Sequence, residues 1–127
     1  MINYITIGTN DFQGAGKFYD AVLGVLGASR AFETDTFIAW ALKSGGPKGG
    51  PMFCLTEPYD GNSATVGNGM MVALTAQSAE TVDAVHKKAL ALGAKDEGAP
   101  GPRSDDRYYI GYFRDLDGNK LCAFYAK

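Results

Sequence analysis

The chain has 127 residues, of which 46% are hydrophobic and 20% are charged. This length predicts one domain, and the composition is that of a globular protein that buries a core without disulfides or a structural metal. Twelve basic and fourteen acidic residues give a net charge of −2. Because no basic cluster is larger than Lys87-Lys88, we expect neither nucleic-acid binding nor a polybasic membrane contact.

Membrane insertion and secretion are not expected either. No apolar stretch approaches the roughly 20 residues that a membrane span needs. The first residues, Met1 to Ile5, lack the basic and apolar regions of a secretory leader. Two cysteines, Cys54 and Cys122, are too few for a disulfide scaffold. The sequence therefore predicts a reduced, cytoplasmic protein.

The first half of the chain predicts a strand, a helix and three further strands. Residues 2–8 alternate apolar and polar side chains, as a half-buried strand does. Asn10 is the expected N-cap of a helix whose apolar positions run from Phe12 to Leu26, with Gly27 after its end. Three β-like runs follow, near 29–33, 36–43 and 51–57.

The second half repeats this order. Residues 69–76 predict a strand, Ser78 an N-cap, and Gly93 the end of a second helix. Runs near 94–97, 107–115 and 119–126 predict three more strands, with a polar loop between the first two. Leu26-Gly27-Ala28 recurs as Leu92-Gly93-Ala94, which favours a duplicated β-α-β-β-β module. A single α+β sandwich with accidental symmetry is the alternative.

Two phrases resemble the vicinal oxygen chelate superfamily, which includes glyoxalase I, bleomycin-resistance proteins and extradiol dioxygenases. They are Lys17-Phe18-Tyr19-Asp20-Ala21-Val22-Leu23-Gly24 and Tyr112-Phe113-Arg114-Asp115-Leu116-Asp117-Gly118-Asn119-Lys120-Leu121. The resemblance implies an α+β fold in which two βαβββ modules form a curled sheet around a central cavity, with the helices outside. It implies one domain over residues 1–127, with module one at 1–66 and module two at 67–127. It also implies a homodimer.

Metal-dependent members of this superfamily bind a divalent ion through His, Glu or Gln on the inward faces of the first and last strands of each module. Strand alternation places Tyr4, Cys54, Met71 and Cys122 at the matching positions. None of the four is a usual ligand of such an ion, so no cofactor is expected. Alternatives are a soft-metal site made by the two cysteines and Met71, a disulfide between the cysteines, and a bulge that turns Glu57 inward.

Further candidate ligand-binding residues are aromatic or basic. Trp40, Tyr109 and Phe124 offer aromatic surface, with core packing as the alternative for each. Arg103 and Arg107 lie in the polar loop expected near the cavity mouth, and either is suited to bind a carboxylate, with an ordinary solvated loop as the alternative. The single histidine, His86, is expected on the solvated surface of the second helix.

The leading hypothesis is a protein of this superfamily that binds a small organic molecule without a metal. Tyr4 would supply a hydroxyl, Met71 and Cys122 soft apolar walls, and Trp40 an aromatic wall. One alternative is a lyase, isomerase or dioxygenase that uses a divalent metal or Tyr4 as an acid–base group. A second alternative is a non-catalytic interaction module with a filled cavity.

Overall fold

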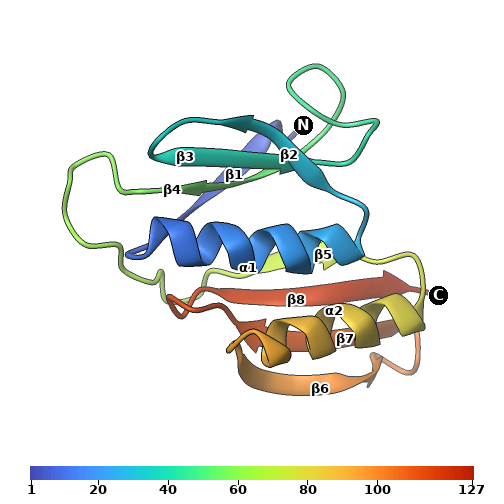
Figure 1. Ribbon diagram of the computed structural model, residues 1–127. Helices are drawn as coiled ribbons and strands as arrows, with labels where there is room; N and C mark the ends of the chain where they lie inside the picture. Colours follow the sequence, from blue (N-terminus) through green and yellow to red (C-terminus); the bar gives the residue numbers. More distant parts are fainter. The chain divides into compact units, whose positions relative to one another are not determined.

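A computed structural model describes all 127 residues and confirms the α+β class with two βαβββ modules (Figure 1). The chain divides into two compact units, Met1–Thr65 and Val66–Lys127. The first contains β1 (Tyr4–Gly8), α1 (Phe12–Val25), β2 (Ser29–Glu33), β3 (Phe37–Ala41) and β4 (Met52–Thr56). The second contains β5 (Val72–Thr75), α2 (Ala79–Ala91), β6 (Lys95–Arg103), β7 (Tyr108–Arg114) and β8 (Lys120–Ala126).

Each unit has an open four-stranded sheet with the same topology. The strand order is β1-β4-β3-β2 in the first sheet and β5-β8-β7-β6 in the second. In both, the first and last strands of the module pair in parallel, and the remaining pairs are antiparallel. The matching order of elements and pairings is what a duplicated module produces.

In the first unit, α1 covers one face of the sheet. Tyr19 of α1 packs against the rings of Trp40 on β3 and Phe53 on β4, at centroid distances of 5.9 and 4.7 Å. Ile38 contacts the same helix, because a side chain added at Gly16 would meet its Cδ1 at 3.1 Å. Alternation along β3 therefore turns Ile38 and Trp40 toward the helix and Ala39 and Ala41 toward the opposite face.

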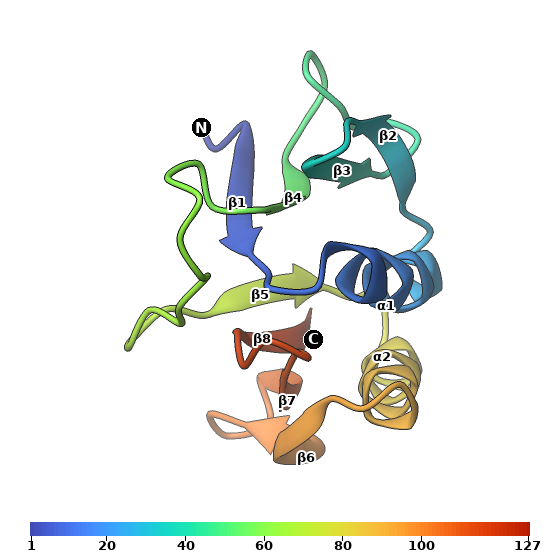
Figure 2. The same cartoon turned by 60° about the vertical axis from the view of Figure 1, so that its left-hand side comes forward.

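In the second unit, α2 packs on β6, β7 and β8 and is seen end-on beside β6 and β7 in Figure 2. Val82, Val85 and Ala89 of α2 are fully buried, as are Phe113 and Leu121 on the facing strands. This apolar layer is the core of the second unit. Neither helix of the chain has the length and apolar character that a membrane crossing requires.

The helix ends agree with the sequence except at one N-cap. Gly27 and Gly93 follow the two helices with φ of 83° and 101°, a backbone conformation that favours glycine. Ser78 caps α2 as predicted, but α1 is capped by Asp11 rather than Asn10. Asn10 instead uses its side-chain amide to pair with the Ala64 backbone, accepting from its N–H at 2.7 Å and donating to its carbonyl at 3.0 Å.

The sixth strand is longer than the sequence predicts. The prediction ended it near residue 97 and assigned a loop to the glycine- and proline-rich stretch that follows. The structure continues β6 to Arg103, with register shifts at Asp96/Gly98 and Gly98/Gly101. These bulges admit residues that interrupt a regular strand, which is why the periodicity did not show it.

His86 is buried rather than solvated, so the prediction for it was wrong. Only 6% of this residue is exposed. Its Nε2 lies 3.1 Å from Asp96 Oδ1 and 3.2 Å from the carbonyl oxygen of Tyr112. The single histidine therefore connects α2 to β6 and β7 of the sheet on which the helix packs.

Candidate functional site

Each sheet has a second face, opposite its helix, which we call the open face. On the first sheet this face holds Tyr4 and Thr6 from β1, because these residues are paired in register with Met52 and Cys54 of β4. Ala39, Ala41, Met52 and Cys54 form a buried apolar cluster there, with Phe37 packed against it. This open face is uncharged, and Tyr4, 53% exposed, is its most accessible candidate residue.

The open face of the second sheet is aromatic and basic. The register places Tyr108, Ile110 and Tyr112 of β7 beside Phe124 and Cys122 of β8 on one face. The Tyr108 and Phe124 rings lie 5.1 Å apart. Residues 108–113 are apolar or aromatic on both faces, so the pairing of β7 with β8, and not alternation, identifies this row.

Two cations lie over one ring of this face. The Arg103 guanidinium carbon is 5.7 Å from the centroid of the Tyr112 ring, and the Lys120 ammonium nitrogen is 5.6 Å from it. Arg103 is held in place by hydrogen bonds to the carbonyl oxygens of Pro102 and Ala99, at 2.9 and 3.1 Å. We call Arg103, Tyr112 and Lys120 the Tyr112 cluster.

Glycines on β6 make room for this arrangement. A side chain at Gly101 would begin 3.1 Å from Arg103 Nη1, and one at Gly98 would begin 3.2 Å from the Tyr112 ring. Gly98 also has a φ of 153°, which L residues rarely adopt. The bulged, glycine-containing strand therefore lets Arg103 fold back over Tyr112.

A further cation lies at the tip of the β6–β7 hairpin. The turn consists of Ser104, Asp105 and Asp106, all with positive φ of 52–67°. It brings Arg107 over the Tyr108 ring, at 6.0 Å from the centroid. Three consecutive non-glycine residues in this region are strained, and such strain is concentrated at functional segments of proteins.

Two predicted ligand-binding residues belong to the helix faces instead. Trp40 is 1% exposed, and its Nε1 donates to Asp20 Oδ1 of α1 at 2.9 Å. The Tyr109 hydroxyl donates to Asp83 Oδ1 of α2, also at 2.9 Å, and this carboxylate raises the Tyr109 pKa. By strand alternation both side chains point toward the helix of their unit. Neither residue therefore lies on the open face, where we expected it.

The other predicted residues are on or beside the open faces. Arg103 and Phe124 are half-buried on the second sheet. Met71 lies one residue before β5 and is 44% exposed. Cys54 and Cys122 are on the open faces by register but are 0% and 1% exposed. The two thiols are therefore covered by neighbouring side chains.

The four residues at the superfamily's metal positions do not fit a divalent ion. Burial raises the pKa of Cys54, and it raises that of Cys122 to about 11 despite the opposing charge of Lys120. A metal bound there would have to displace a proton from each thiol, against the effect of burial. Tyr4 and Met71 are weak ligands. Nowhere do three His, Cys, Asp or Glu side chains gather in a group that could hold a metal. Both cysteines are free.

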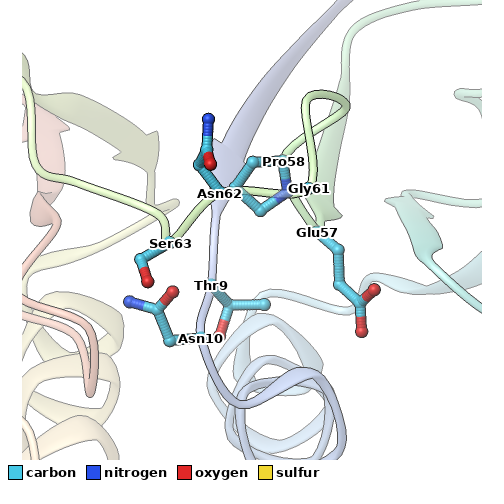
Figure 3. A pocket seen from close by; sticks show the side chains of 7 residues that line it. All are labelled: Thr9, Asn10, Glu57, Pro58, Gly61, Asn62 and Ser63. Carbon is cyan, nitrogen blue, oxygen red and sulfur yellow. The ribbon is translucent and has the colours of Figure 1, made fainter.

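A polar pocket, which the sequence did not predict, lies within the first unit where β1 and β4 end. It has a volume of about 250 Å³ and is lined by Thr9, Asn10, Glu57, Pro58, Gly61, Asn62 and Ser63. In Figure 3 the Asn10 amide lies next to Ser63, while the Glu57 carboxylate extends to the opposite side. The Asn10–Ala64 pairing described above holds this loop in place.

Family comparison agrees with the fold. The model of the Glyoxalase/Bleomycin resistance protein/Dioxygenase superfamily matches residues 1–123. The chain therefore belongs to this superfamily. No curated protein sequence matches it significantly.

Among solved structures, the chain is similar to a glyoxalase/bleomycin resistance protein from Albidiferax ferrireducens T118. The two are 36% identical with a TM-score of 0.89, over 100% of this chain and 99% of the other. A genomically encoded fosfomycin resistance protein from Listeria monocytogenes is 19% identical, with a TM-score of 0.73 and coverage of 100% and 93%. A lactoylglutathione lyase from Agrobacterium tumefaciens is 18% identical, with a TM-score of 0.69 and coverage of 98% and 92%. The last two show a shared fold only.

Proposed function

We propose that this protein binds a small organic molecule without the help of a metal ion. The observation that carries the proposal is the chemistry of the metal positions: Tyr4, Met71 and two protonated, buried thiols stand where the superfamily's metal-dependent members have imidazole and carboxylate. With both thiols covered, the accessible groups are the Tyr4 hydroxyl in the first unit and the Met71 thioether in the second. This set favours retention of the fold for binding rather than for chemistry at a Lewis-acidic ion.

The second unit supports the location of such a site. Its open face combines the half-buried rings of Tyr108, Tyr112 and Phe124 with basic side chains above them. Aromatic surface contributes large contact area, and a few polar groups orient the ligand. In the first unit, taken by itself, the accessible Tyr4 hydroxyl is the polar group of the open face.

The experiment combines metal analysis with ligand screening on the full chain. Purified protein is assayed for bound metal and titrated calorimetrically with Mn²⁺, Ni²⁺ and Zn²⁺. A library of small organic molecules is then screened by thermal shift, with and without EDTA. We expect no stoichiometric metal and a ligand-induced rise in Tm that EDTA leaves unchanged. Stoichiometric metal, or a Tm shift that EDTA abolishes, would favour the metal-dependent lyase, isomerase or dioxygenase and overturn the proposal.

The non-catalytic interaction module is distinguished by the same screen. A packed protein with no ligand site shows no thermal shift with any compound. We also propose a cytoplasmic homodimer, supported by the free thiols and by exposed apolar residues such as Phe32 and Met70, at 57% and 58%. Light scattering at micromolar concentration tests the dimer, and a monomer mass contradicts it.

A further inference from the structure

Two positive charges of the second open face, those of Arg103 and Lys120, form no ion pair within the chain. Of the cations of this face, only Arg114 forms an ion pair, with Glu97 Oε1 at 2.6 Å. Arg103 donates only to backbone carbonyls, and Lys120 forms no ion pair. The hydrogen bond from Arg114 and the charges of Arg114, Lys95 and Lys120 lower the pKa of Glu97. Arg103 and Lys120 nevertheless share the ring of Tyr112.

Arg103 reaches the Tyr112 ring from β6 and Lys120 reaches it from β8, and neither cation forms an ion pair. Glu97 is already engaged by Arg114. An anion bound beside this ring would be attracted by both charges. A guanidinium suits the two oxygens of a carboxylate, and an ammonium adds a third donor.

The arrangement is built into the strand rather than left to flexible side chains. Two backbone carbonyls fix the Arg103 guanidinium, and the space at Gly98 and Gly101 is needed for it to lie over Tyr112. An arginine fixed in this way loses little conformational entropy when it binds an anion. Its remaining N–H groups are donors without an acidic partner.

The surface beside these cations is suited to a planar ring. Register pairs Tyr112 with Cys122 and Ile110 with Phe124, so the apolar row continues along β7 and β8 from the Tyr112 cluster. Ile110 is 7% exposed, whereas Phe124 is half-buried and in contact with the Tyr108 ring. On this face Phe124 belongs to the pair next to Tyr112 and Cys122, and Tyr108 belongs to the pair after that.

We infer that the ligand is a planar organic acid, whose carboxylate is bound by Arg103 and Lys120 and whose ring lies on Phe124 and Tyr108. This inference rests on the proposed function and names the ligand class of the same site. The uncharged open face of the first sheet offers no such partner for an anion. The polar pocket has Glu57 in its lining, which disfavours an anion there.

The test compares acids with their neutral amides. Benzoate and 2-naphthoate, and then benzamide and 2-naphthamide, are titrated by calorimetry into the full chain in the presence of EDTA. We expect saturable binding of the acids that is at least about ten-fold tighter than that of the amides, as a charge-assisted pair provides. The salt dependence of acid binding follows from the same charges.

Charge-removing variants locate the contact. Arg103→Gln and Lys120→Gln each weaken acid binding by about ten-fold while amide binding changes little. Lys87→Gln removes an equal charge from the exposed surface of α2 and leaves both unchanged. Far-ultraviolet circular dichroism and Tm confirm that each variant is folded, and two independent variants keep the test valid if one is not.

The outcomes separate this inference from the proposed function. Acids and amides that bind equally well, or an Arg103→Gln effect no larger than that of Lys87→Gln, overturn the acid-binding inference and leave metal-free binding intact. Acid binding that requires added Mn²⁺ overturns both. Absence of saturable binding of either acid overturns the inference, and the library screen then decides the proposed function alone.

Discussion

Asp20 of α1 accepts a hydrogen bond from the indole N–H of Trp40 through Oδ1, at 2.9 Å. The same carboxylate binds Arg30 of β2 through both oxygens, at 2.8 Å each. The indole is fully buried, so its single donor must find a partner inside the protein. This bond explains why Trp40 faces α1 in the core of the first unit.

Removing the carboxylate is expected to destabilise the protein. Asp20→Ala leaves the buried indole N–H without an acceptor, which costs about 1–3 kcal/mol in the free energy of unfolding. Asp20→Asn retains an acceptor oxygen for Trp40 and loses less. Urea denaturation followed by Trp40 fluorescence measures both. Equal stability of wild type and Asp20→Ala would show that this bond contributes nothing.

The same carboxylate makes stability depend on acid pH. Burial raises the pKa of Asp20, but the hydrogen bonds from Arg30 and Trp40 and the Arg30 charge outweigh it, so the pKa lies below its ordinary 3.8. A lowered pKa in the folded state contributes stability above the unfolded pKa and loses it as pH falls through the folded value. We therefore expect the unfolding free energy to fall below about pH 4 more steeply in wild type than in Asp20→Asn. Parallel pH profiles would contradict this.

Two glycines offer a matched pair of substitutions. A side chain at Gly111 on β7 would begin 2.9 Å from Pro100 Cγ and 3.3 Å from His86 Cδ2, so Gly111→Ala overpacks this region. We expect a loss of about 1–3 kcal/mol. Nothing lies within 4 Å of the equivalent atom at Gly24 in α1, so Gly24→Ala is expected to stabilise by about 0.5–1 kcal/mol. Thermal denaturation compares them, and a neutral Gly111→Ala would indicate that β6 readily moves.

The buried thiols are expected to be unreactive while the protein is folded. Burial raises the pKa of Cys54, and it raises that of Cys122 to about 11, so little thiolate exists at neutral pH. Ellman's reagent should label neither cysteine in native buffer and both in denaturant. Rapid native labelling of either would mean that the thiol is accessible and available as a nucleophile or metal ligand.

Periodicity predicted the elements well where they are regular. Alternation and helical spacing identified both helices and most strands, because one face of each is buried. The second part of β6 was missed because Gly98, Pro100 and Gly101 break its pattern, and only its pairing with β7 shows that the strand continues. Local spacing also could not distinguish Asn10 from Asp11 as the N-cap, since both are good capping residues.

The candidate site was predicted less well, because a residue's face depends on register. Cys122 and Phe124 were placed on the correct face, since β8 alternates regularly. Trp40 and Tyr109 were chosen for their chemistry, and their partners Asp20 and Asp83 are distant in sequence. Alternation along β8 places Lys120 on the same face as Cys122. Its position over the Tyr112 ring depends on the pairing of β7 with β8, which alternation does not give.

The most direct test of metal-free acid binding is an amide-resolved NMR titration of the wild-type chain with 2-naphthoate in EDTA. The account predicts saturating chemical-shift changes centred on Arg103, Tyr112, Lys120 and Phe124, unchanged when EDTA is replaced by one equivalent of Mg²⁺. Shift changes that occur only with the metal, or that saturate elsewhere on the protein, would contradict it.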